Sequence, residues 1–248
     1  MDGAGLALVE TITNPLCRVP DVEVIAAVAR DRGVPLLVDN TFASPILFRP
    51  LEVGATAVMH SATKYIGGHS DLIAGVVVGT AEAMSAARAR SVRTGSTLGP
   101  FEAWLALRGL RSLEVRMRRH SDNAIAVARA LQGMPGVARV HHPWLPGSVS
   151  HDVAHRLMPE GTGGMLAFDL DGGRDAVQRM LSRFQMVRFA ASLGGIETTV
   201  SYPEITSHRA LSPQQRAELG VGSGTVRVSV GIEAAEDIVA DFAHALSE

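Results

Sequence analysis

The stretch that decides the fold is LLVDNTFASPILFRPLEVGATAVMHSATKYIGGHSD, residues 36–71. It opens on a continuous apolar run, residues 36–38, which stops at Asp39. Continuous apolar strands that are joined by helices are typical of parallel sheets covered on both faces. In such sheets, ligands bind beyond the carboxyl ends of the strands. The stretch therefore predicts an α/β domain with a ligand-binding edge near Asp39.

The sequence on either side of this stretch extends the α/β pattern. A short apolar strand is expected at Leu6–Glu10, and a helix capped by Asp21 is expected to run to about Arg32. Two further strands are expected at residues 55–59 and 73–79. The first part of the chain is thus expected to hold a sheet rich in parallel pairs.

The pattern changes after residue 100, where one long helix is predicted over Phe101–Leu131. The mixture of short strands and helices that follows predicts a smaller α+β domain. We place the boundary so that residues 1–104 belong to a large domain and residues 105–248 to the α+β domain. The later elements are expected as strands at Val137–His141, Met165–Leu170 and Thr225–Val230, and as helices at Arg174–Arg183 and Glu236–Leu246.

Composition narrows the class of protein. The 248 residues carry a net charge of −2 with both signs interspersed, so no basic surface for nucleic acid is expected. No apolar run reaches the ~18 residues of a membrane-spanning helix, and no secretory signal is visible, so no membrane partner is expected. Cys17 is the single cysteine, which rules out an internal disulfide and is typical of the cytoplasm.

Lys64 is the only lysine in the chain. The other 22 of the 23 Lys and Arg residues are arginines. An amine can lose its proton and condense with an aldehyde, whereas a guanidinium stays protonated. A lysine aldimine of pyridoxal phosphate also needs a carboxylate for the pyridinium nitrogen, hydroxyl donors for the phosphate, and an arginine for the substrate carboxylate. Asp39, Ser61, Thr63 and Arg227 are candidates for these parts.

Each candidate also has a structural explanation when it is taken alone. Asp39 could cap the turn that follows its strand, and Ser61 and Thr63 could bond local backbone. Arg227 could form an internal salt bridge. No His, Cys or carboxylate set has convincing metal spacing, so no metal is expected. The combination around one lysine favours the cofactor interpretation.

Several motifs closely resemble the Cys/Met-metabolism family of pyridoxal-phosphate enzymes, which includes cystathionine γ-synthase, cystathionine γ-lyase and methionine γ-lyase. The resemblance covers almost the whole chain. It implies an α/β fold of the fold-type-I, aminotransferase-like kind, in which residues 1–104 are part of the cofactor-binding large domain. The motifs are VDNTFASP (38–45), RPLEVGA (49–55), HSATKYIGGHSD (60–71), RGLRSL (108–113), SLGGIE (192–197) and VRVSVGIE (226–233).

The resemblance implies a cofactor site for pyridoxal 5'-phosphate. Lys64 is similar to the Schiff-base lysine, which also moves protons, and Asp39 to the partner of the pyridinium nitrogen. Ser61 and Thr63 resemble phosphate ligands. Asn14 resembles the asparagine near the phenolic oxygen of the cofactor; without the family, an Asn-Pro turn would explain it.

The resemblance also implies an activity. Ser192 and Arg227 resemble the residues that hold the α-carboxylate of a small amino-acid substrate. The expected enzyme is a carbon–sulfur lyase or γ-replacement enzyme of the transsulfuration type, and the sequence leaves elimination and replacement open. Family members form dimers that pair into tetramers, so a cytoplasmic homo-oligomer is expected.

One departure from the family concerns the N-terminal side. The arm that reaches a neighbouring active site, the glycine-containing phosphate turn and the ring-stacking tyrosine cannot be located. We therefore expect the chain to correspond to the C-terminal portion of such an enzyme. The alternative hypothesis is an inactive remnant, or one piece of a split enzyme that needs a complementing N-terminal fragment.

Overall fold

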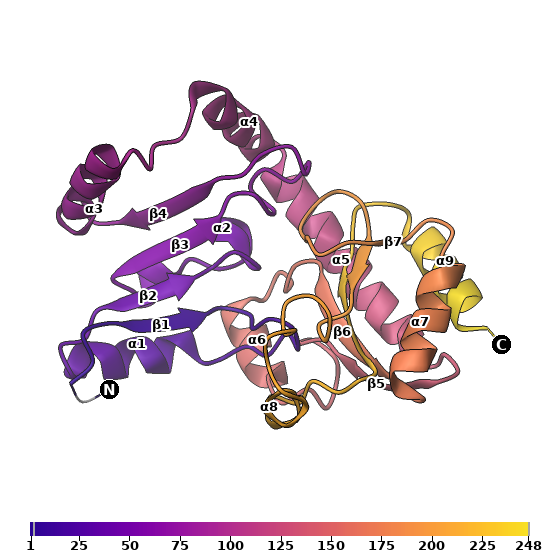
Figure 1. Cartoon of the computed structure of the whole chain (residues 1–248). Coiled ribbons are helices and arrows are strands. Elements are labelled where there is room, and N and C mark those ends of the chain that lie inside the picture. The colour runs from indigo at the N-terminus through magenta and orange to yellow at the C-terminus, as the bar shows by residue number, and fades with distance from the viewer. Residues whose placement is uncertain (2, 248) are drawn as a thin grey trace. The chain divides into compact units, whose positions relative to one another are not determined.

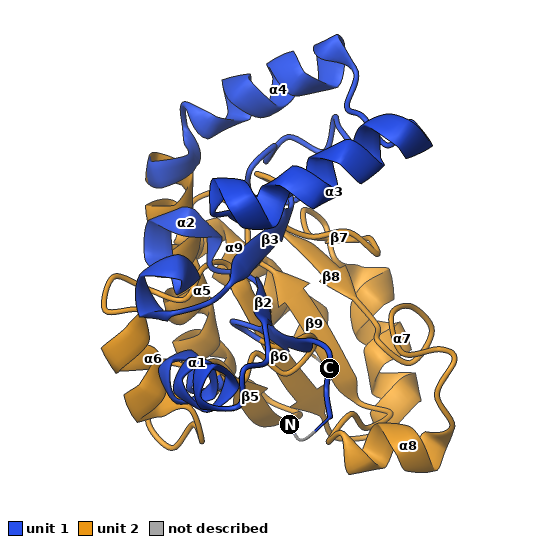
Figure 2. Cartoon of the chain, turned by 90° about the vertical axis from the view of Figure 1, so that its left-hand side faces the viewer, with its two compact units in different colours: residues 1–12, 20–114 blue, residues 13–19, 115–248 orange. Residues whose placement is uncertain are grey.

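The computed structural model describes residues 1 and 3–247. It divides the chain into two compact units, coloured separately in Figure 2. The expected boundary at residues 104/105 falls inside α4 (Pro100–Leu110), which lies wholly in unit 1. Unit 1 comprises Met1–Ile12 and Pro20–Glu114, and unit 2 comprises Thr13–Val19 and Val115–Glu248.

Unit 1 is built on a four-stranded sheet in the order β1-β2-β3-β4 (Figure 1). The strands β1 to β3 are parallel, and β4 runs antiparallel to β3. Asp39 is in register with Glu10 and with Met59, so the carboxyl ends of the three parallel strands meet at one edge. The predicted parallel-rich sheet is confirmed. The strands are β1 (Ala7–Glu10), β2 (Leu36–Asp39), β3 (Ala57–Ser61) and β4 (Gly75–Gly79).

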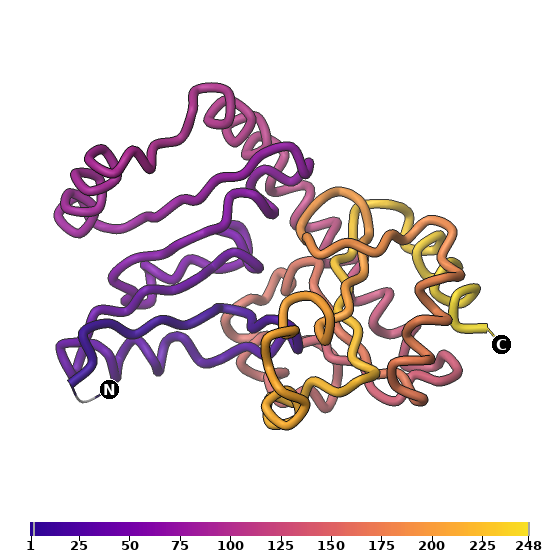
Figure 3. The backbone as a smooth tube through the Cα atoms, in the orientation of Figure 1, coloured from indigo at the N-terminus to yellow at the C-terminus, as the bar shows by residue number. Residues whose placement is uncertain are grey.

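Helices of very different burial accompany this sheet. The predicted helix α1 (Val22–Asp31) is present, and the Asp21 side chain accepts a hydrogen bond from the Val24 N–H as its cap. It buries Val22, Ala26 and Ala29. In contrast, α3 (Ala81–Thr94) buries none of its residues. Figure 3 traces the backbone from β4 through α3 to α4. Two short helical turns, α2 (Ser44–Leu47) and η1 (Pro50–Val53), complete the unit.

The predicted single helix over Phe101–Leu131 is wrong, because the structure has two helices, α4 and α5 (Leu113–Leu131). At the break, the Ser112 N–H and the Ser112 hydroxyl both donate to the Gly109 carbonyl, at 3.2 and 3.3 Å. These bonds close a tight turn over three residues and compete with the regular helical ladder. The local hydroxyl therefore stops α4 although the apolar pattern continues.

Unit 2 contains a five-stranded sheet in the order β5-β6-β9-β8-β7. Antiparallel pairs predominate, which confirms the predicted α+β character. Among the described residues of both units, no helix is long and apolar enough to cross a membrane. The elements after α5 are β5 (Val137–His141), α6 (His151–Leu157), β6 (Met165–Leu170), α7 (Gly173–Arg183), β7 (Arg188–Phe189), β8 (Thr199–Ser201), α8 (Pro213–Glu218), β9 (Thr225–Ser229) and α9 (Ala235–Leu246).

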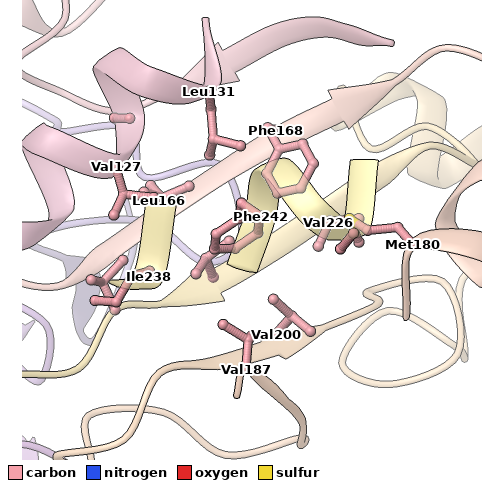
Figure 4. Close-up of a cluster of buried hydrophobic side chains, with 14 of the residues drawn as sticks. Val127, Leu131, Leu166, Phe168, Met180, Val187, Val200, Val226, Ile238 and Phe242 are labelled. Atoms are coloured by element: carbon pink, nitrogen blue, oxygen red, sulfur yellow. The ribbon is translucent and has the colours of Figure 1, made fainter. Parts of the chain in front are cut away.

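The core of unit 2 lies between this sheet and the helices α5, α7 and α9 (Figure 4). Phe242 is central to it, since its ring meets Phe168 and Phe184 edge to face at centroid distances of 5.9 and 5.1 Å. Edge-to-face packing is a favoured arrangement of aromatic rings. Because β9 passes through this core, a charged side chain on β9 must be held by specific partners.

Candidate active site

Asp39 ends β2 and is anchored by Thr41. One carboxylate oxygen, Oδ1, accepts hydrogen bonds from the Thr41 N–H at 3.0 Å and from the Thr41 hydroxyl at 2.5 Å. The Thr41 hydroxyl in turn accepts a hydrogen bond from the Ser61 N–H at 2.8 Å. Within the described residues no hydrogen bond reaches Oδ2 of Asp39. The ends of β2 and β3 are thus tied together, and one carboxylate oxygen remains available for a ligand.

Lys64 lies in a tight turn that begins at the end of β3. Its N–H donates to the Ser61 carbonyl at 3.1 Å, and its carbonyl accepts from the Gly68 N–H at 2.7 Å. Ala62 and Tyr65, which flank Thr63 and Lys64, are buried. The buried neighbours fix the turn, so Lys64 is held at the same sheet edge as Asp39.

The two hydroxyl residues before Lys64 differ in their surroundings. The Ser61 hydroxyl makes no hydrogen bond with the part of the chain that the structure describes, so it can donate to a ligand. The Thr63 hydroxyl accepts from the Ala74 N–H at 3.0 Å and donates to the Ala74 carbonyl at 3.3 Å. The Thr63 hydroxyl is therefore bonded to backbone, as the simpler interpretation of the sequence has it, although the partner lies eleven residues along the chain. It could bind a phosphate only after giving up the longer bond.

The remaining predicted site residues, Asn14, Ser192 and Arg227, belong to unit 2. Arg227 lies in β9 and contacts the other two. It is only 4% exposed. One terminal nitrogen, Nη1, donates to Asn14 Oδ1 at 3.0 Å, and the other, Nη2, donates to the Ser192 carbonyl at 3.2 Å. These acceptors are uncharged oxygens, so they orient the guanidinium without neutralising it. Ser192 contributes its main-chain carbonyl to this contact.

The field around Arg227 is positive. Burial lowers the pKa of His208, and Arg227 and Arg216 lower it further. Burial raises the pKa of the Cys17 thiol to about 12, although Arg227 acts in the opposite direction. Cys17 is therefore a neutral thiol and a poor nucleophile at neutral pH. The positive charge of the buried Arg227 suits a carboxylate ligand.

A second network holds the loop that carries Ser192. The Thr198 hydroxyl donates to Glu233 Oε2 at 2.9 Å and accepts from the Gly231 N–H at 2.9 Å. The Asn123 amide donates to the carbonyls of Gly231 and Glu233 at 3.0 and 2.8 Å. Sequence reasoning assigned no role to Thr198 or Glu233, and it also missed Thr41. Thr41 and Glu233 lie within the quoted motifs, so the motifs themselves were the available signal.

The residues of unit 1 fit pyridoxal phosphate. The unbonded Oδ2 of Asp39 can accept a ring N–H, the Ser61 hydroxyl can donate to a phosphate, and Lys64 supplies an amine at the same edge. Among the described residues, no group of three His, Cys, Asp or Glu side chains could hold a metal ion. The arrangement has the features of an aldehyde-cofactor site with a nearby basic amine.

Comparison with known proteins defines the class. The chain matches the family described as "Cys/Met metabolism PLP-dependent enzyme" over residues 3–247, and it belongs to this family. It is 42% identical, over 98% of its own length, to the O-succinylhomoserine sulfhydrylase of Pseudomonas aeruginosa, and 40% identical, over 100% of its length, to the cystathionine gamma-lyase of Dictyostelium discoideum. The family is pyridoxal-phosphate dependent.

Solved structures agree with this assignment. The cystathionine gamma synthase of Xanthomonas oryzae pv. oryzae, solved in complex with aminoacrylate and cysteine, matches with a TM-score of 0.94 and 41% identity over 98% of this chain. The predicted fold-type-I, pyridoxal-phosphate enzyme fold is confirmed. The chain spans 62% of that structure, and 60% and 64% of the two relatives above.

Proposed function

We propose that this chain carries most of the active site of a pyridoxal-phosphate-dependent enzyme of sulfur amino-acid metabolism. The proposed activity is a carbon–sulfur lyase or a γ-replacement enzyme of the transsulfuration type. The observation that carries the proposal is the sheet edge of unit 1, where an available carboxylate oxygen, an available hydroxyl and the only lysine lie within three chain positions of the ends of β2 and β3.

Pyridoxal phosphate, when bound, supplies an electron-accepting ring for reactions at the α-carbon of an amino acid. Asp39 would hold the ring nitrogen through Oδ2, and Ser61 would donate to the phosphate. Asn14 is proposed to lie near the phenolic oxygen of the cofactor. The unprotonated amine of Lys64 would take the proton from the substrate α-carbon and return it later.

Arg227 is proposed to bind the α-carboxylate of the amino acid, with Ser192 beside it. A guanidinium presents parallel donors that match the two oxygens of a carboxylate. Asn14 and the Ser192 carbonyl already fix the plane of this fork. The substrate would therefore meet an arginine that needs little reordering.

The test is a covalent map of the cofactor. The protein is incubated with pyridoxal phosphate, reduced with borohydride and digested, and the pyridoxyl group is expected on Lys64. The variant Lys64→Arg keeps the charge and is expected to lose the adduct and the yellow colour. A wild-type protein that takes up no cofactor, or carries it only at the α-amine, would overturn the proposal.

Elimination and replacement are separated by their products. With a γ-substituted amino acid alone, a lyase releases ammonia and a keto acid, whereas a replacement enzyme joins an added thiol to the γ-carbon. Both assays use the same substrate with and without the thiol. The ratio of the two product yields assigns the reaction.

A second candidate function is that of one part of a split enzyme. Unit 1 exposes apolar side chains: Val76, Val77 and Val78 of β4 are 37%, 53% and 43% exposed, although they alternate between the two faces of the sheet. Together with the 60% coverage of a relative, this surface suits cover by a complementing N-terminal fragment or by a second copy in a homo-oligomer. Light scattering, with and without the N-terminal segment of a relative added as a separate chain, tests it. A monodisperse monomer that does not bind the added segment would contradict both the complementing fragment and the homo-oligomer.

A further inference from the structure

We propose that Thr41 is a positioning residue that aims the free oxygen of Asp39 at the cofactor, an inference that rests on the proposed function. The proposed function gives Thr41 no direct contact with the ring or the phosphate of the cofactor. It acts through Asp39, by its backbone and side-chain bonds to Oδ1 at 3.0 and 2.5 Å. Its side chain is 9% exposed, so water competes weakly for these bonds.

The direction of the hydroxyl proton of Thr41 is determined by its neighbours. A backbone N–H can only donate, so the bond from Ser61 makes Thr41 Oγ1 an acceptor there. The single hydroxyl proton is then left for Asp39 Oδ1. Both donors of Thr41 thus reach Oδ1, and among the described residues none reaches Oδ2. Asp39 is therefore held as an acceptor, with Oδ2 turned to the ligand.

The same side chain also couples the two ends of the proposed cofactor site. Asp39 is the proposed partner of the ring, and Ser61 is the proposed donor to the phosphate. Thr41 Oγ1 bonds to both residues, at 2.5 and 2.8 Å. A shift of the end of β2 relative to that of β3 would break one of these bonds. Thr41 thus fixes the spacing between the ring and phosphate partners.

A simpler explanation is that residues 39–41 form an ordinary turn in which a carboxylate accepts the N–H two positions later. That turn needs only the backbone N–H of position 41. The two explanations therefore differ in what the hydroxyl does. Thr41→Val removes the hydroxyl at constant shape and keeps the turn, whereas Thr41→Ser keeps both.

The test measures the dissociation constant of pyridoxal phosphate by fluorescence in the wild type and in each variant. Thr41→Val is expected to raise it by about tenfold, and Thr41→Ser by less than about threefold. Thr56→Val is the matched control, because the Thr56 hydroxyl also accepts a backbone N–H, that of Leu36 at 3.0 Å, but at the amino end of β3. Failure of the wild type to bind would defeat the proposed function. Normal binding by Thr41→Val would defeat the inference alone.

Discussion

Gly109 packs against the carbonyl oxygen of Ile66, and the contact leaves no room for a side chain at position 109. A Cβ built on Gly109 would collide with the carbonyl oxygens of Ile66 and Gly67, and it would lie 3.0 Å from the Gly67 Cα. All these obstacles are backbone atoms, which cannot turn aside as a flexible side chain does. The backbone of α4 therefore rests directly on the turn that carries Lys64.

Gly109→Ala is expected to destabilise unit 1. In an open helix this substitution would stabilise by about 0.5–1 kcal/mol, because glycine loses more freedom on folding. The collision is expected to outweigh this gain, at about 1–3 kcal/mol for overpacking. Urea unfolding measures the difference, and the yield of pyridoxyl-Lys64 after borohydride reduction is expected to fall with it. Gly75→Ala in β4 is the control, since its nearest obstacle is 4.0 Å away; equal stability losses in both variants would contradict the argument.

Asn14→Asp is expected to block the substrate carboxylate without removing any atom that contacts Arg227. The new carboxylate would lie about where Oδ1 now accepts from Nη1 at 3.0 Å, and it would neutralise the guanidinium. The Michaelis constant for the amino acid is expected to rise by about 1.5 to 3.5 orders of magnitude, because an arginine–carboxylate contact contributes about 2–5 kcal/mol. Steady-state kinetics against an amino-acid substrate measures this.

The comparison variant is Arg227→Ala, which removes the fork altogether. It is expected to raise the Michaelis constant at least as far, while the pyridoxyl adduct on Lys64 forms as in the wild type. A melting curve is recorded beside each variant. Loss of stability and of cofactor together would show that Arg227 supports folding and would contradict its substrate role.

The stability of unit 2 is expected to fall as the pH drops from 7 to 5. Burial lowers the pKa of His120 to about 4, against an opposing hydrogen bond to the Val230 carbonyl, and burial lowers that of His142 to about 3. In the unfolded chain a histidine titrates near pH ~6.5. Below that pH the unfolded state binds protons that the folded state excludes, so stability is complete above it and is lost on acidification. The loss at pH 5 is expected to be about 2 kcal/mol for each histidine.

Denaturant unfolding at pH 7 and pH 5 measures this loss. His142→Gln is expected to reduce the pH dependence, and His244→Gln, at an exposed position of α9, is expected to leave it unchanged. Parallel pH profiles of all three proteins would contradict the assignment to buried histidines.

Asp241→Asn is expected to destabilise unit 2 by about 2–4 kcal/mol, since hydrogen bonds to a charged group are worth about 1.5–3 kcal/mol each. The Asp241 carboxylate accepts three backbone N–H groups, those of Gln185, Met186 and Val187, at 2.9, 2.9 and 2.7 Å. An amide has only one acceptor oxygen, so at least one N–H would face another donor. Asp237→Asn, exposed on the same helix, is expected to change stability by less than about 0.5 kcal/mol in the same unfolding assay. Similar losses in both would show that the charge of α9 matters and not its bonds.

The parts of the fold and site that the sequence predicted are those that local pattern determines. Asp39 and Lys64 could be placed together because both follow apolar strands, and parallel strands end at one edge. The break between α4 and α5 could not be predicted, because the apolar repeat continues through it and one serine hydroxyl decides the geometry. The engagement of Thr63 with Ala74 was also hidden, since it depends on a partner eleven residues away across the turn.

Long-range contacts explain the other differences. Residues 13–19 separate β1 from α1 in the sequence, and nothing local shows that they pack in unit 2. They do so through bonds such as that from the Val19 N–H to the Ser150 hydroxyl at 2.9 Å, between positions 131 residues apart. Neither the apolar pattern nor the turn residues carries information about such a partner.

The placement of residues 13–19 has a consequence for recombination between relatives. The chain passes between the units at 12/13, 19/20 and 114/115, so a single crossover at 114/115 does not exchange a whole unit. A chimera made there would inherit Asn14 from one parent and Arg227 from the other, although the two side chains are bonded at 3.0 Å. Exchanging unit 2 between family members would therefore require transplanting two separate stretches, the short one together with the C-terminal one.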